Sequence, residues 1–385
     1  MRKATPLDIA TVLGELVSIP SVSSVSPEFD TPNRALVARI ADYFDGLGWR
    51  CEIMELPGAP GKANLVASLG DGEGGLALAG HGDTVPWDEG AWSSDPFRLV
   101  ERDGRLYGLG AADMKGFLAL AIVLASRIER ARLRRPLYIV VTADEESRMD
   151  GARLLVETGR PPASWCIVGE PTDLAPVRMH KGVLMEAVVV EGASGHSSDP
   201  DSAPNAIEGM ARILAMLVAW RREMQGAQPT PDFAVPYPTL NLGAIHGGDN
   251  PNRICARAEL HVDLRPLPGT ELDSLRRELD ERARSALEGS GCSYRRRSLF
   301  DGISGFETSR ASRLVRLTEE LSGIGARAVS FGTEAGFFSA MGMETLVLGP
   351  GSIEQAHKPD EFIETAALAR AEILFGELIE RLVLS

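Results

Sequence analysis

Hydrophobic residues recur every three or four positions in two segments near the start of the chain, residues 9–17 and 36–47. This spacing places apolar side chains on one face of an α-helix, so the pattern predicts an amphipathic helix in each segment. The second segment stops at Gly48, a residue type that commonly ends a helix. The apolar residues of the first segment form no continuous run, which indicates an ordinary helix and not a signal peptide.

Short, continuous apolar runs alternate with helical patterns along much of the chain. Such runs are typical of strands buried on both faces of a sheet. A further helical pattern covers residues 114–128. The alternation predicts an α/β sheet covered by helices. The predicted buried strands are residues 63–69, 76–79, 137–141, 165–168 and 345–348.

The pattern changes near Lys181. Residues 183–190 are predicted as a long strand, a helical pattern covers 206–222, and residues 257–264 alternate between apolar and polar side chains. The order strand, helix, strand, strand, helix indicates a small α+β domain inserted at about residues 181–292. The first domain is expected to resume after this insertion.

The length and the charge of the chain narrow the class of protein. A chain of 385 residues exceeds one comfortable hydrophobic core, which agrees with two domains. Apolar residues make up 44% and charged residues 24%, as in globular enzymes. The net charge of −14 disfavours nucleic acid and anionic membrane surfaces and favours a cationic or zwitterionic small molecule, although taken alone it is better explained by solubility. No apolar run is long enough to predict a membrane span.

The four cysteines are scattered along the chain without a Cys-x-x-Cys pair. Such spacing indicates neither a disulfide framework nor a zinc site made of thiolates. Unpaired cysteines fit a reducing compartment, so we expect a cytoplasmic protein.

Acidic and imidazole side chains follow nearly every predicted strand of the larger domain. Ligands in open α/β sheets bind outside the carboxyl ends of the strands, so these side chains are expected to converge. They offer nitrogen and oxygen ligands suited to zinc or cobalt, and with one bridging carboxylate they would suit two metal ions. The residues are His81, Asp83, Glu145, Glu146, Glu170 and His357.

Each of these motifs alone has a simpler interpretation. His81 and Asp83 also fit a polar loop, and Glu145 with Glu146 also fits an exposed acidic turn. Asp113 follows a glycine-rich stretch and could cap the next helix. That stretch lacks the third glycine of a dinucleotide-binding loop, which argues against nucleotide binding.

Taken in order along most of the chain, the motifs resemble the M20 metallopeptidase family of aminoacylases, carboxypeptidases and desuccinylases. Within that family, the stretches 332–335 and 349–359 most resemble the deacetylases that act on acetylornithine. The segments that carry the resemblance are residues 76–86, 107–116, 142–146, 169–172, 180–182, 194–199, 239–243, 263–268, 332–335 and 348–352.

The resemblance implies a fold and an assembly. A zinc-exopeptidase-like catalytic domain, with a mixed sheet between helices, would comprise residues 1–180 and 293–385. An inserted α+β, ferredoxin-like domain, residues 181–292, would form a homodimer.

The resemblance also implies roles for the site residues. It assigns Asp113 as the bridge between two Zn²⁺ ions, for which Co²⁺ is a possible substitute. His81 and Glu170 would bind one ion, and Glu146 and His357 the other. Glu145 would be the general base, Asp83 the partner of His81, and His196 would reach the active site of the neighbouring subunit. The implied roles cover His81, Asp83, Asp113, Glu145, Glu146, Glu170, His196 and His357.

Three further residues are candidates for binding the substrate. Asn252 and Arg265 match positions that hold the substrate carboxylate in relatives, and Glu334 is our candidate to meet the δ-ammonium group of acetylornithine. For Glu334, a surface or helix-capping role is an equally good interpretation. One departure from the family pattern is Gly82, where threonine is common. The histidines at positions 180, 246 and 261 are interpreted as local or structural polar groups.

The implied activity is hydrolysis of a linear amide bond, which removes the acetyl group from N2-acetyl-L-ornithine in arginine biosynthesis. Other hydrolases on the same metal core stay open, namely a succinyl-diaminopimelate desuccinylase, an acetylcitrulline deacetylase or a dipeptidase. A third alternative is a non-catalytic metal-binding dimer. Glu145 beside a complete ligand set argues against it, because a degenerate enzyme is expected to lose its proton carrier.

Overall fold

The computed structural model describes residues 7–226 and 229–385. The chain divides into two compact units. Unit 1 comprises Met1–Arg178, Thr308–Arg327 and Phe337–Ser385, and unit 2 comprises Met179–Glu307 and Ala328–Gly336.

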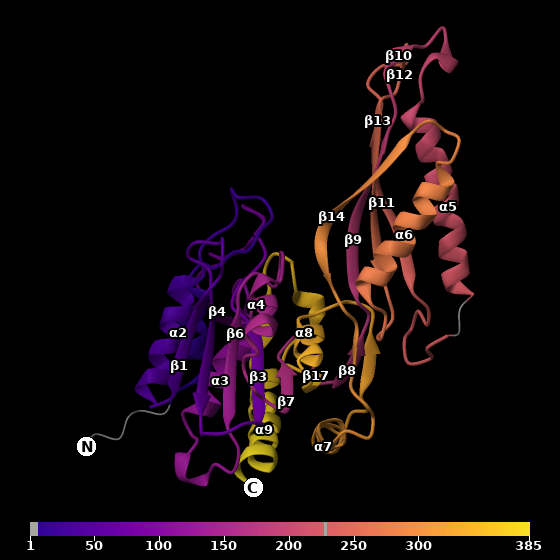
Figure 1. Ribbon diagram of the computed structural model, residues 1–385. Coiled ribbons are helices and arrows are strands. Elements are labelled where there is room, and N and C mark those ends of the chain that lie inside the picture. The colour runs from indigo at the N-terminus through magenta and orange to yellow at the C-terminus, as the bar shows by residue number, and fades with distance from the viewer. Residues whose placement is uncertain (1–6, 227–228) are drawn as a thin grey trace. The chain divides into compact units, whose positions relative to one another are not determined.

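Unit 1 is built on a mixed sheet with the strand order β1-β2-β6-β3-β7-β17, which β8 continues (Figure 1). In the centre, β3 is parallel to β6 and β7, and β7 is parallel to β17. At the two sides, β8 runs antiparallel to β17, and β1 and β2 run antiparallel to their neighbours. The bounds are β1 (Arg50–Glu55), β2 (Ala63–Leu69), β3 (Leu76–His81), β6 (Leu137–Thr142), β7 (Trp165–Val168), β8 (Val177–His180) and β17 (Glu344–Val347).

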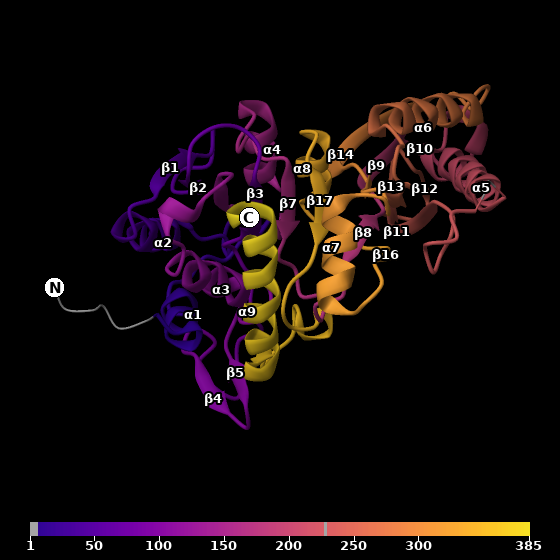
Figure 2. The same ribbon diagram turned by 90° about the horizontal axis from the view of Figure 1, so that it is seen from below.

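Helices cover both faces of this sheet because its central strands are apolar throughout. All residues of β2, β3 and β6 are buried. On one face, α3 is buried on all sides between the sheet and its neighbours, including α9 (Figure 2). On the other face, Asn64 of β2 donates its amide N–H to the carbonyl of Gly151 in α4 at 2.8 Å. The helices are α1 (Ile9–Val17), α2 (Arg34–Gly46), α3 (Lys115–Ala125), α4 (Asp150–Thr158), α7 (Arg313–Ser322), α8 (Ala335–Ala340) and α9 (Thr365–Ile379).

The α/β prediction for this region is confirmed, and the apolar patterns locate its central elements within a few residues. A small antiparallel sheet, β18-β5-β4, was missed because its strands are only three residues long and half exposed. Its bounds are β4 (Val100–Arg102), β5 (Arg105–Tyr107) and β18 (Phe362–Glu364).

Unit 2 has the element order βαββαβ and an antiparallel sheet in the order β11-β13-β9-β14, which is the ferredoxin-like arrangement. The predicted insertion ended at residue 292, so it left out β14, which pairs with β9 along most of its length. The bounds are β9 (Val183–Glu191), α5 (Ala206–Gln225), β11 (Thr239–Gly247), β13 (Arg257–Arg265), α6 (Leu272–Ala286) and β14 (Ser293–Ile303).

The core of unit 2 lies between one face of its sheet and the two helices. In β13, residues alternate between buried and more exposed, as the sequence pattern predicted. Two short strands, β10 (Gly195–His196) and β12 (Arg253–Ile254), form a separate pair. Near the boundary of the units, β15 (Phe306–Glu307) pairs with β8, and so does β16 (Arg327–Val329). In the part of the chain that the structure describes, every helix is too short or too polar to cross a bilayer.

Candidate metal centre

Three buried side chains meet at the carboxyl ends of β3 and β7. His81 is the last residue of β3, Asp113 lies in the loop before α3, and Glu170 follows β7. The Nε2 atom of His81 lies 3.2 Å from Asp113 Oδ1 and 4.0 Å from Glu170 Oε2. Because β3 and β7 are parallel neighbours, their carboxyl ends lie at the same edge of the sheet.

His357 completes the cluster from a loop that follows β17. Its Nε2 atom lies 3.0 Å from Glu146 Oε2 and 3.6 Å from Asp113 Oδ2. Asp113 therefore presents one carboxylate oxygen to His81 and the other to His357. This is the arrangement that a carboxylate shared by two metal ions requires.

Asp83 supports the turn that carries Glu145 and Glu146. Its carboxylate accepts the backbone N–H of Glu145 at 3.3 Å and of Glu146 at 3.1 Å. This carboxylate was predicted to pair with His81, but the Nδ1 atom of His81 lies 2.9 Å from the main-chain oxygen of Asp83 and 3.8 Å from its carboxylate. The main-chain oxygen therefore accepts the second ring N–H of His81, and the carboxylate is left to orient the turn.

The donor set fits two divalent ions. Ligand atoms of His81, Glu145 and Glu170 lie within 4.8 Å of one another, and so do those of His81, Asp113 and Glu146. Imidazole nitrogen and carboxylate oxygen suit zinc, and the cluster contains no thiolate. Glu145, the expected base, is therefore a member of the first of these two groups.

The carboxylates of the cluster oppose one another electrostatically. Burial raises the pKa of Glu170 well above its ordinary value, and the charge of Asp113 raises it further. Burial and the charge of Asp113 also raise the pKa of Glu146. For Asp113, burial would raise the pKa, but hydrogen bonds from His357 and His81 outweigh burial and lower it. Divalent cations would offset this crowding of negative charge.

Comparison with known proteins agrees with this chemistry. The sequence profile of peptidase family M20/M25/M40 matches residues 77–381. The chain belongs to this family.

Curated relatives cover nearly the whole M20 chain. An acetylornithine deacetylase from Pasteurella multocida is 46% identical over 364 residues, which is 94% of this chain and 95% of the relative. An acetylornithine deacetylase from Edwardsiella ictaluri is 47% identical and covers 94% of this chain and 95% of the relative.

Solved structures confirm the M20 fold. A tripeptidase from Staphylococcus aureus superposes with a TM-score of 0.76 at 20% identity and covers 97% of each chain. A dinuclear metal binding peptidase of the M20 family from Bacillus subtilis superposes with a TM-score of 0.66 at 17% identity and covers 96% of each chain. At these identities the likeness concerns the fold alone.

A buried ion pair that the sequence analysis missed supports the acidic turn of this M20 chain. Lys62 Nζ lies 2.6 Å from Asp144 Oδ1 and 2.7 Å from Asp30 Oδ1. Ser23 donates its hydroxyl to Asp144 Oδ1 at 3.2 Å. Asp144 adopts a φ of +59° directly before Glu145, so these contacts hold the turn in its left-handed conformation. A single lysine before a strand has no sequence signature that would reveal this role.

The remaining predicted site residues of the M20 chain lie in unit 2. His196 is exposed in β10, and its Nδ1 atom lies 2.7 Å from Ser198 Oγ. Asn252 is exposed before β12, and Arg265 forms an ion pair with Asp263 at 2.9 Å. The contribution of these residues to substrate binding stays a prediction.

Glu334 is fully buried directly before α8. The alternative of a surface glutamate is therefore wrong. Its neighbour Thr333 accepts the backbone N–H of Ala335 at 3.1 Å, so a threonine hydroxyl binds the first amide of the helix. A role of Glu334 toward the substrate also stays a prediction.

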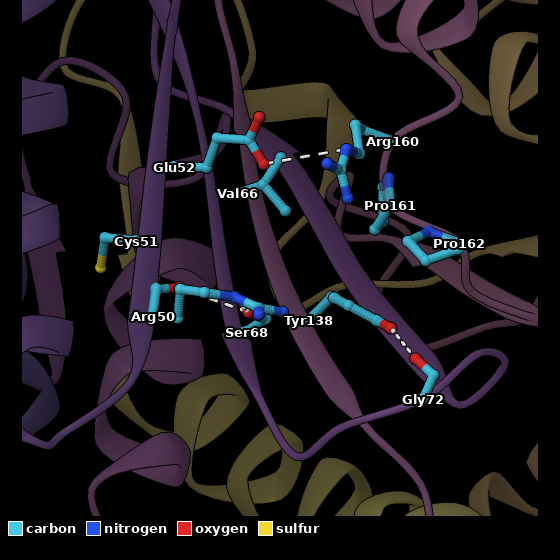
Figure 3. A pocket seen from close by; sticks show the side chains of 10 residues that line it. All are labelled: Arg50, Cys51, Glu52, Val66, Ser68, Gly72, Tyr138, Arg160, Pro161 and Pro162. Carbon is cyan, nitrogen blue, oxygen red and sulfur yellow. Dashed lines mark hydrogen bonds and ion pairs between the residues drawn. The ribbon is translucent and has the colours of Figure 1, made fainter.

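A separate cavity of about 510 Å³ lies over the other end of the same sheet (Figure 3). Arg50, Ser68 and Tyr138 form a row across β1, β2 and β6, and Arg160 lies 3.8 Å from Glu52 at the rim. Tyr138 is near the start of β6, whereas the metal cluster follows its end. The cavity thus belongs to a different region from the cluster.

Proposed function

We propose that this chain hydrolyses the acetyl amide of N2-acetyl-L-ornithine and releases L-ornithine and acetate, a step of arginine biosynthesis. The observation that carries the proposal is the position of Asp113, with one carboxylate oxygen toward His81 and the other toward His357. The name of the relatives that are 46% and 47% identical supports the choice of substrate.

The proposed cofactors are two Zn²⁺ ions, which Co²⁺ could replace. His81 and Glu170 would hold one ion, Glu146 and His357 would hold the other, and Asp113 would contact both. When bound, the ions would supply positive charge that makes a water molecule more acidic and stabilises negative charge on the amide oxygen.

Glu145 is the proposed proton carrier. Its carboxylate would take a proton from the attacking water as the water oxygen bonds to the acetyl carbon. When the carbon–nitrogen bond breaks, Glu145 would return that proton to the amine nitrogen, so the base is regenerated. The hydrogen bonds from the amides of Glu145 and Glu146 to Asp83 support this role because they fix the turn relative to β3.

Unit 2 is proposed to contribute to substrate binding and assembly. Asn252 and Arg265 would hold the substrate carboxylate, and Glu334 would meet the δ-ammonium group. A homodimer through unit 2 would bring His196 to the active site of the partner subunit. The net charge of −14 agrees with a substrate that carries a cationic side chain.

The proposed location is the cytoplasm. Cys51, Cys255 and Cys292 form no disulfide in the structure, which agrees with a reducing compartment.

The test of the proposed function is release of ornithine from acetylornithine by protein reconstituted with Zn²⁺ or Co²⁺. Succinyl-diaminopimelate, acetylcitrulline and a set of dipeptides serve as competing substrates. We expect the highest kcat/KM for acetylornithine and loss of activity after chelation, with recovery on adding metal. A higher kcat/KM for another substrate would assign the chain to that activity, and no turnover of any of them would leave the non-catalytic alternative.

The dimer can be tested by mixing two inactive variants, His196→Ala and Glu145→Gln. If the histidine acts across the interface, heterodimers contain one complete site and recover part of the activity. Absence of recovery, with heterodimers shown to form by mass spectrometry, would rule out this role of His196.

A further inference from the structure

Glu361 is a buried carboxylate that neither the motifs nor the proposed mechanism uses. Its exposed fraction is 2%. Its Oε2 atom accepts the N–H of Gly110 at 2.8 Å, and its Oε1 atom accepts the N–H of Ala112 at 2.7 Å and of Asp113 at 2.9 Å. Its main-chain oxygen accepts the N–H of Gly108 at 3.0 Å. One residue therefore binds four amides of the loop that ends at the central carboxylate of the metal cluster.

The loop has a tight conformation that depends on these bonds. Gly110 has a φ of +77°, and a Cβ atom at this position would lie 2.7 Å from the side chain of Thr84. In this conformation its N–H and those of Ala112 and Asp113 point to one place, which forms an anion-binding concavity of backbone amides. Both side-chain oxygens of Glu361 act as acceptors here, and an amide side chain could not match this because one of its two terminal atoms is an NH₂ donor.

The stretch that contains Glu361 also begins at His357. After Glu361, Phe362 of β18 pairs with Tyr107 of β5, and before it Asp360 accepts the backbone N–H and the hydroxyl of Ser93 at 2.8 and 2.9 Å. The segment between His357 and β18 is therefore attached at both ends to the part of the chain that precedes Asp113. Displacement of either loop would be transmitted to the other.

We propose that Glu361 is a positioning residue that holds the peptide groups before Asp113 and ties this loop to the one carrying His357. It acts through the backbone and sets the spacing of the two side chains. The proposal rests on the proposed function, in which Asp113 and His357 bind metal. It adds a residue that contacts no ion itself but determines how well two ligands are placed.

The test compares Glu361→Gln with the unmodified full-length protein. The amide nitrogen of glutamine would face at least one backbone N–H, so one or more of the bonds is lost. In metal-free protein, we expect amide hydrogen exchange in residues 108–113 to become about tenfold faster while exchange in β14 is unchanged. Affinity for Co²⁺, measured by competition with a chelator, is expected to fall by about 10- to 100-fold.

Glu364→Gln is the matched control, because it removes an exposed carboxylate three residues further along the chain. It should leave both readouts within about twofold of the unmodified protein. Glu361→Asp keeps the carboxyl group with its two acceptor oxygens but is one methylene shorter, so it is expected to give intermediate values. It also carries the test if the glutamine variant does not fold.

Four results would overturn the proposal. The first is amide hydrogen exchange in residues 108–113 within twofold of the unmodified protein, and the second is an unchanged Co²⁺ affinity. The third is amide hydrogen exchange that rises equally throughout unit 1, and the fourth is failure of both variants to fold. The last two would make Glu361 a general stabilising residue. Lack of Co²⁺ binding by the unmodified protein would instead refute the proposed metal function, and the exchange of residues 108–113 would still report on Glu361.

Discussion

Two fully buried histidines lie at the ends of strands in different units, and their surroundings have opposite effects. His81 ends β3 among carboxylates, with Asp113 at 3.2 Å. His180 ends β8, where its Nδ1–H donates to the carbonyl of Lys181 at 2.8 Å and its Nε2 accepts the N–H of Thr333 at 3.2 Å. Burial alone would lower both pKa values.

The groups that contact each imidazole decide whether its pKa is raised or lowered. At His81, hydrogen bonding to Asp113 and the charges of Glu170 and Glu145 outweigh burial, and the pKa lies well above its ordinary value. At His180 the hydrogen-bond partners are backbone groups, and burial lowers the pKa to about 4. The first site is therefore prepared for positive charge, whereas the second keeps a neutral imidazole in a structural role.

Two buried lysines of unit 1 repeat the contrast. Burial lowers the pKa of Lys62, but hydrogen bonds to Asp144 and Asp30 more than reverse this effect and raise it. Lys115 donates to the main-chain oxygens of Leu16 and Ile19 at 3.1 and 3.0 Å, and burial lowers its pKa to about 7. The two lysines thus differ because Lys62 has carboxylate hydrogen-bond partners and Lys115 has carbonyl ones.

The largest expected effect concerns the carboxylate-rich region around His81. Glu145→Gln should lower kcat by about 10²- to 10⁴-fold, because the amide cannot carry the proton. Steady-state kinetics with acetylornithine, together with metal content by elemental analysis, measures this. Glu129→Gln, at an exposed position, is the control and should be fully active. Near-normal turnover of Glu145→Gln would remove this residue from the proton-transfer role.

The next effect is on stability. Lys62→Met leaves the buried carboxylate of Asp144 without its cation and should lower the free energy of unfolding by about 3–5 kcal/mol. Lys115→Met leaves only neutral carbonyls unpaired and should cost about 1–3 kcal/mol. Urea unfolding measures both. The double variant Lys62→Met, Asp144→Asn should recover part of the loss. Equal losses for the two lysine variants would contradict the contrast between charged and neutral partners.

A smaller effect depends on pH and on His180. In the unfolded chain, His180 has its ordinary pKa of 6.5 and takes up a proton below that pH. In the folded protein, the lowered pKa keeps His180 neutral down to about pH 4. The unfolded state thus binds more protons in this window, so stability falls as pH falls from about 6.5 to 4, by up to about 3 kcal/mol.

The His180→Gln variant isolates this contribution. Between pH 7 and pH 5, its urea midpoint should change less than that of the unmodified protein, when both are metal-free. His246→Gln replaces an exposed histidine and should keep the full pH dependence. The same slope in all three proteins would show that His180 does not account for the loss.

The smallest effect is expected where charged partners are exposed. Arg34 and Glu55 lie 2.8 Å apart, but 41% and 59% of their side-chain surfaces are exposed. Water screens such a pair, so Glu55→Gln should lower stability by less than about 1 kcal/mol, and by less still in 1 M salt. Urea titrations at low and high salt test this. A loss of stability comparable to that of Lys62→Met would mean that an exposed charged partner stabilises the protein as much as a buried one.

The comparison also explains which site residues could be predicted. His81, Glu145, Glu146 and Glu170 follow apolar runs, and neighbouring parallel strands bring their ends to one edge, so these side chains could be expected to converge. The backbone acceptor of His81 could not be predicted, because the sequence does not show whether a carbonyl or a carboxylate lies nearer. Lys62 and Glu361 were missed because their partners, Asp144 and the amides before Asp113, are far from them in the chain.

The sequence by itself predicted the α/β core, the inserted unit up to its last strand β14, and the side chains at the strand ends of the candidate metal centre, because hydrophobic period and strand-end residues are local properties. Only the tertiary structure decided that Asp113 turns one oxygen to His81 and the other to His357, and that His180 is held neutral. The physical reason is that the charge state and direction of a buried polar group depend on the partners that folding brings within about 3–4 Å, and these come from distant segments.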